Sequence, residues 1–282
     1  SGIRSEGKAQ TRIRAETRTV KAGSSAGDTY GGLSSGATGT LTEITATDTI
    51  DISAKSTGDG KAADGVSGSA TDRLLLKAQT VDIDAEVNSG VAYGSNFATI
   101  DAKTVDIDVR STADLSAKTN AIGANKTIIK NADTVTVDVN TRNHNSSGLS
   151  ESTVTMNNGG SVTVNATISG GSLYSNSEAI GISGSQVTAN GGKVTATATA
   201  NYCSDATAIA DSTIKAKDVA ASAKGGISGA NNTTTGILNG SITAENNLMV
   251  TAENGKYSTG IENNSGNNTH TAKYAELNVS ST

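Results

Sequence analysis

Residues 99–109 read TIDAKTVDIDV, and this stretch decides the fold. Apolar and polar residues alternate on both sides of Lys103, which is the period-two pattern of β-strands with one buried face. The pattern returns as TVDIDA at residues 80–85 and as TVTVDV at residues 134–139. Recurrence of this kind is typical of a solenoid, in which each turn can bury its apolar residues only against neighbouring turns.

Each repeat unit is about 29 residues long and holds three short apolar segments. The first segments are anchored at Ile13, Ile44, Leu75, Ile100, Ile128, Val154, Val187, Ile214, Ile242 and Ala272. The second follow at Ile50, Val81, Val105, Val135, Val162, Val194, Val219 and Met249. The third contain small turn-like pairs, among them Gly65-Val66, Gly90-Val91, Ile122-Gly123, Gly148-Leu149 and Ile209-Ala210. We therefore predict an all-β, right-handed parallel β-helix of about nine to ten turns with three strands per turn.

The composition requires a thin core. The chain has 32 Gly, no Pro, no Trp, one Phe and 2% aromatic residues, so large side chains are not available to fill a wide interior. The absence of Pro suits a structure in which almost every backbone N–H pairs with a neighbouring strand. We expect Val81, Val105, Val135, Val162 and Val194 to form one inward column.

No change in composition divides the chain, and we predict that residues 1–282 form a single β-helix segment of a longer repeat protein. Ser1-Gly2-Ile3 looks like a third segment and Leu277 to Val279 like a second one, so both ends fall within a unit. Open ends of a β-solenoid expose sheet edges. The expected partners are therefore copies of the chain, associated end to end, or further repeats of the same chain.

The repeats at residues 80–85, 104–109 and 134–139, with their Gly-Ile or Ile-Gly turns, resemble the β-helical passengers of bacterial autotransporters and haemagglutinin-type adhesins. The family's membrane barrel is missing, because the C-terminal residues lack a terminal aromatic strand, and the Asn-Pro-Asn-Leu signature of two-partner secretion is impossible without Pro. The resemblance implies an extracellular or cell-surface location and a role in adhesion or aggregation, with a host or bacterial surface glycan as a possible ligand.

Four function classes follow from these observations. The first is a non-enzymatic, secreted or surface-displayed solenoid for adhesion, aggregation or a stalk, and the second is a polysaccharide-binding or glycan-cleaving enzyme. A phage tail-fibre segment and an ice-binding solenoid are minor alternatives.

The net charge of −5 and the absence of a nucleic-acid motif argue against nucleic acid as a partner. The longest aliphatic run, Leu74 to Leu76, is far too short to span a membrane.

The strongest candidate site is acidic. Alignment of the second segments places Asp51, Asp82 and Asp106 in one outward column and Asp84, Asp108 and Asp138 in the next. Turns about 4.8 Å apart bring these carboxylates close enough to repel one another, so either some pKa values rise or cations bridge the columns. Calcium is the natural cation because it accepts several carboxylate oxygens in loose geometry. We expect no other cofactor.

Other residues offer weaker signals. Thr136, Thr163 and Thr195 should extend the first acidic column, as in an ice-binding array. The candidates for stacking on sugars are Tyr93, Tyr174, Tyr202 and Tyr257. His144, His270 and Cys203 lie far apart in sequence, so no catalytic residue is assigned.

Overall fold

The computed structural model describes residues 3–6, 12–24, 29–36, 43–58, 60–70, 73–112, 119–142, 144–170, 177–201, 204–226, 232–264 and 268–281. Every helix or strand assigned within these ranges is a β-strand. The described part of the chain contains no helix long and apolar enough to cross a membrane.

Short and long strands alternate along the chain. The long strands are β2 (Arg12–Ser24), β4 (Glu43–Ser56), β6 (Leu74–Val87), β8 (Ala98–Ser111), β10 (Ile128–Thr141), β12 (Thr153–Ile168), β14 (Gln186–Ala200), β16 (Thr213–Gly225) and β18 (Ser241–Gly255). The short strands are β1 (Ile3–Glu6), β3 (Thr29–Gly36), β5 (Ala63–Ser67), β7 (Gly90–Asn96), β9 (Thr119–Asn125), β11 (Ser146–Ser150), β13 (Glu178–Ser183), β15 (Asp205–Ala210), β17 (Thr233–Leu238) and β19 (Tyr257–Glu262). Two further strands, β20 (His270–Thr271) and β21 (Tyr274–Ser281), both pair with β18.

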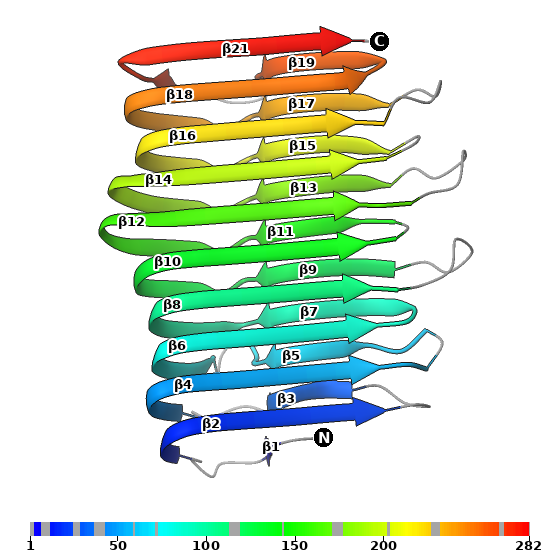
Figure 1. Ribbon diagram of the computed structural model, residues 1–282, viewed down its shortest axis with the longest axis vertical. Coiled ribbons are helices and arrows are strands. Elements are labelled where there is room, and N and C mark those ends of the chain that lie inside the picture. The colour runs from blue at the N-terminus through cyan, green and yellow to red at the C-terminus, as the bar shows by residue number, and fades with distance from the viewer. Residues whose placement is uncertain are drawn as a thin grey trace.

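In the part of the chain that the structure describes, the two kinds of strand form two stacked parallel sheets, one of ten short strands and one of eleven strands that contains the long ones. Figure 1 shows the long strands running from left to right at the front and the short strands returning behind them as the chain rises from the N-terminus to the C-terminus. This path is that of a right-handed coil. The predicted all-β parallel β-helix is therefore confirmed.

One detail differs from the prediction of three strands per turn. The first and second predicted segments lie in one long strand, which bends around the left edge of the stack (Figure 1). Between β8 and β10 the register is interrupted only between Lys130 and Thr134, and Asn131 adopts a φ of 60° within the interruption. The corner is short enough for hydrogen bonding between turns to resume directly after it, so the two segments remain one strand.

The inward column predicted from the second segments is confirmed. Val81, Val105, Val135, Val162 and Val194 are in register with one another and are buried. Some anchor positions were wrong by one or two residues: Leu76, Ile129 and Leu248 take the inward positions predicted for Leu75, Ile128 and Met249, and His270 replaces Ala272. Leu74 to Leu76 and Ile128 to Ile129 offer adjacent apolar residues, so alternation alone cannot decide which one faces inward.

The third segments carry a column of glycines that lets the two sheets approach each other. A Cβ built on Gly148 would lie 2.1 Å from Cγ1 of Val164 in the facing sheet and 2.5 Å from the carbonyl oxygen of Gly181. The same crowding, at 2.1–2.4 Å from a facing Ile or Val, occurs at Gly65, Gly94, Gly123 and Gly236. Ala208 lies in register with these glycines in the short-strand sheet. Ala221 lies opposite, in the column of the other sheet that contains the facing Ile and Val residues. Glycine thus faces Ile or Val across the core in five turns, and two alanines take these places in the turn of Ala208 and Ala221.

A ladder of buried hydroxyl groups joins the turns where the short strands lead into the long ones. The backbone N–H groups of Thr127, Ser152 and Ser185 donate to the Oγ atoms of the serines one turn later, each at 3.0 Å. The accepting hydroxyls of Ser152, Ser185 and Ser212 donate in turn to the carbonyl oxygens two residues before them, at 2.6–2.9 Å. These bonds satisfy buried backbone N–H groups at the corner.

Replacing Gly148 by alanine tests the close approach of the sheets. The new methyl group must displace Val164 or the neighbouring backbone, and overpacking of this kind costs about 1–3 kcal/mol. We expect the midpoint of urea unfolding to fall for Gly148→Ala and to recover in part in the double variant with Val164→Ala. A single variant as stable as the parent chain would contradict the tight contact between the sheets.

Candidate functional site on the outward face of the long strands

The outward face of the second halves of the long strands carries three parallel columns of side chains, which we call the ladder face. The first column contains Asp51, Asp82 and Asp106 and continues through Thr136, Thr163, Thr195, Ala220, Met249 and Glu276. The second contains Asp84, Asp108 and Asp138, followed by Asn165 and Thr197. Both predicted acidic columns are therefore present, and the predicted threonines extend the first of them.

Burial, and then crowding of the carboxylates, raise the pKa values of three aspartates in the columns. Burial first, and then the negative charges of Asp84, Asp106, Asp51 and Asp108, raise the pKa of Asp82 from 3.8 to about 6. The pKa values of Asp84 and Asp106 also rise, chiefly because of burial and then because of neighbouring aspartates. The first of the two outcomes predicted for the columns, raised pKa values, is thus present.

Neighbouring side chains neutralise part of the second column. Arg110 donates to Asp108 at 3.0 Å, and the amide nitrogen of Asn165 donates to Asp138 at 2.6 Å. The third column contains Lys55, Glu86 and Arg110, followed by Asn140 and Thr167, and in it Lys55 pairs with Glu86 at 2.8 Å. Arg110 also lowers the pKa of Asp84, against the larger effect of burial. Cationic and amide side chains of the chain itself thus compensate part of the negative charge that a bound cation would otherwise neutralise.

The aspartates do not converge on one point. Within the described ranges, no group of three or more His, Cys, Asp or Glu side chains is arranged to hold a metal ion. Outward side chains of a straight column extend side by side, whereas a calcium ion needs several oxygen ligands around a single centre. Calcium binding at Asp51, Asp82, Asp106, Asp84, Asp108 and Asp138 stays a prediction from the sequence.

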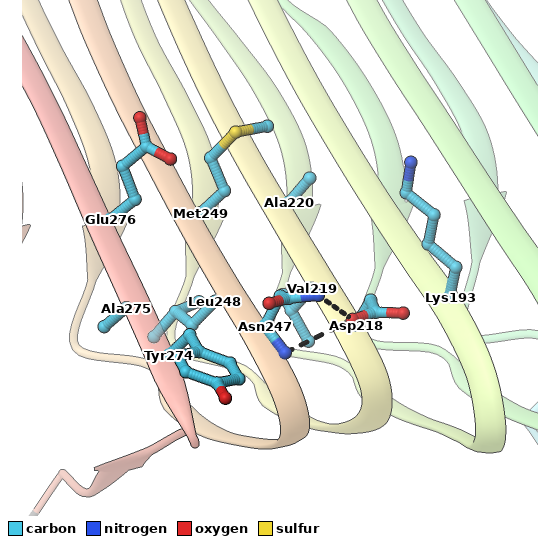
Figure 2. Close-up of a pocket in the computed structure, with 10 residues that line it drawn as sticks. All are labelled: Lys193, Asp218, Val219, Ala220, Asn247, Leu248, Met249, Tyr274, Ala275 and Glu276. Atoms are coloured by element: carbon cyan, nitrogen blue, oxygen red, sulfur yellow. Dashed lines mark hydrogen bonds between the residues drawn. The ribbon is translucent and has the colours of Figure 1, made fainter.

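Toward the C-terminal end the first column becomes apolar and forms a hollow of about 670 Å³. Ala220 is a small residue beside Met249, and Figure 2 shows Met249 and Glu276 extending in the same direction from neighbouring strands. The adjoining column contributes Lys193, Asp218 and Tyr274 to the lining. The hollow is therefore amphipathic.

Hydrogen bonds fix the carboxylate of this hollow. The side-chain amides of Asn246 and Asn247 and the backbone N–H of Asn247 all donate to Oδ1 of Asp218, at 2.6–3.2 Å. Slight desolvation raises the pKa of Asp218, but these hydrogen bonds outweigh it and the net shift is downward. Asp218 therefore presents an ionised group with a fixed orientation. Sequence reasoning missed it because it belongs to the corner of the coil, where apolar alternation is interrupted.

The remaining candidate residues lie in separate places. Tyr93 is half-buried on the outward face of β7, in the other sheet, whereas Tyr257 is 58% exposed on β19. His144 precedes β11, and His270 is on β20, where burial lowers its pKa. Tyr174, Tyr202 and Cys203 lie outside the described residues. The structure does not bring the two histidines into one site, because they occupy different turns and different corners.

Comparison of the chain with protein-family models, with curated proteins and with solved structures finds no match.

Asp82 should make the stability of the fold depend on pH. Because its folded-state pKa lies above the ordinary value, its contribution to stability is complete below pH 3.8 and is lost as the pH rises through about 6. Asp82→Asn should therefore raise the melting temperature at pH 7.5 and leave it nearly unchanged at pH 3.5. Solvent screening limits the gain to about 1 kcal/mol or less.

The matched control is Asp101→Asn, which removes the partner of Lys130 at 3.6 Å and should produce no gain at pH 7.5. A gain for Asp82→Asn of equal size at both pH values, or a loss at pH 7.5, would contradict the electrostatic account of the acidic columns.

Proposed function

We propose that this chain is a non-enzymatic, secreted or surface-displayed β-solenoid that acts in adhesion or aggregation or as an extracellular stalk. The observation that carries the proposal is the ladder face. Its columns repeat short polar side chains at one spacing from turn to turn, so a partner can make the same weak contact many times. The resemblance of residues 80–85, 104–109 and 134–139 to autotransporter passengers and haemagglutinin-type adhesins supports the same role.

A second part of the proposal is self-association through the last described turns. Among the side chains whose exposure the structure describes, the large hydrophobic ones that are exposed all lie in these turns: Met249, Tyr257, Tyr274, Leu277 and Val279. Leu277 and Val279 continue the inward columns of Val250 and Ala252, yet they are 52% and 50% exposed. Another coil that paired with β21 would cover these side chains and satisfy the strand edge.

A glycan-cleaving enzyme is the alternative that a specific observation favours. Burial and the neighbouring aspartates raise the pKa of Asp82 to about 6, so this carboxyl group is about half protonated at pH 6, and it lies one turn from the carboxyl group of Asp106. Hydrolysis of acidic polysaccharides that is abolished by Asp82→Asn would favour this alternative over the adhesive role.

Beads coated with the chain test the adhesive proposal in two ways. We expect coated beads to attach to cell surfaces and to clump with one another, whereas albumin-coated beads should do neither. Introducing charge with Leu277→Glu and Val279→Glu should reduce clumping alone, since it makes the end contact unfavourable. Equal attachment and clumping by both kinds of bead would refute adhesion, and clumping that is unaffected by the two glutamates would refute the end contact.

A further inference from the structure

A groove of about 280 Å³ crosses the outward face of the short-strand sheet, on the side opposite the ladder face. Four strands contribute to it, β7, β9, β11 and β13, which are consecutive in the sheet (Figure 1). One column in this groove runs through Tyr93, Ile122, Ser147 and Ile180. Because Ser147 has a small side chain and lies between Ile122 and Ile180, a hollow remains above it. The two isoleucines form the apolar walls of this hollow.

Polar groups border the groove along the neighbouring column. Asn145 is exposed, and its Oδ1 accepts the backbone N–H of Glu178 at 3.0 Å. Thr207 donates its hydroxyl to Oε1 of Glu178 at 3.3 Å, which holds this carboxyl group at the groove. Ser150 and Ser183, in register with each other, line the other side. Hydrogen-bonding groups thus lie on both sides of the apolar walls.

The charge of the groove narrows the class of ligand. No lysine, arginine or histidine is among the described residues that line it, so the groove contains no counter-charge for a phosphate, a sulfate or an acidic sugar. Burial, and then the negative charge of Asp205, raise the pKa of Glu178, which disfavours the anionic form of this carboxyl group. A strongly cationic ligand is therefore not favoured either.

We propose that this groove binds a neutral sugar unit of a glycan. The C–H faces of a pyranose ring match the walls formed by Ile122 and Ile180 and the exposed part of the Tyr93 ring. Ring hydroxyl groups match Asn145, Glu178 and Ser147, which offer both donors and acceptors. This proposal rests on the proposed adhesive function, to which it adds a ligand class and a binding site.

Calorimetric titration of the purified chain with neutral oligosaccharides of glucose, galactose, mannose and N-acetylglucosamine tests the proposal. Sialyllactose and a galacturonate trisaccharide serve as acidic comparisons. Ser147→Ile fills the groove with a residue that suits an outward strand position, and it should weaken binding of a neutral oligosaccharide at least about tenfold. Glu178→Gln retains the shape and most hydrogen bonds and should change the affinity less than about threefold.

The matched control is Thr155→Ile, which adds a similar side chain to the exposed outward side of the first half of β12, away from both the groove and the ladder face, and should leave sugar binding unchanged. Melting temperatures of all variants verify folding. The proposal falls if no neutral oligosaccharide binds at up to about 10 mM, if acidic oligosaccharides bind more tightly, or if Ser147→Ile binds like the parent chain. Because the bead assay measures attachment separately, attachment without sugar binding would refute the groove and leave the adhesive function standing.

Discussion

Each long strand from β4 to β16 hydrogen bonds to the long strand one turn before it and one turn after it, in parallel and mostly in register. This pairing fixes which residues are stacked above one another, because side chains of parallel strands occupy the same position in every turn. The inward valine column from Val81 to Val194 and the outward column from Asp51 to Thr195 are two consequences of one register. A one-residue shift would exchange them, so burial of the valines also determines the position of the acidic columns.

The thin core imposes a second requirement, which the glycines meet. The facing sheet contributes Ile107, Val137 and Val164, and the contacts of Gly94, Gly123 and Gly148 leave no space for a Cβ opposite them. The hydroxyl ladder at Ser152 and Ser185 then satisfies backbone groups at the corner. At these glycines the two sheets lie in contact with each other. The candidate sites are therefore on the two outer surfaces, where a small residue such as Ser147 or Ala220 leaves a hollow between larger neighbours.

The sequence predicts the fold and the acidic columns well because both depend on alternation within the second segments, which is regular from Val81 to Val194. It predicts the third segments less well: Ser95, rather than Val91, lies level with Val66. The groove at Ser147 could not be predicted, because it combines side chains from four turns whose third-segment register depends on the lengths of the intervening loops. The sequence predicts a raised pKa in the columns because stacked carboxylates repel one another. It does not predict burial, the largest cause of the shift at Asp82, nor the partners Arg110 and Asn165.

The in-register stack fixes the spacing of the outward column from turn to turn. Double electron–electron resonance between two spin labels measures this spacing directly. Labels at Asp82 on β6 and Met249 on β18, in a Cys203→Ser background, are six turns apart in the register of the long strands. At about 4.8 Å per turn, the account predicts one narrow distance distribution centred near about 29 Å, apart from the few ångströms added by the labels. A broad distribution, or a mean beyond about 40 Å, would contradict the in-register stack.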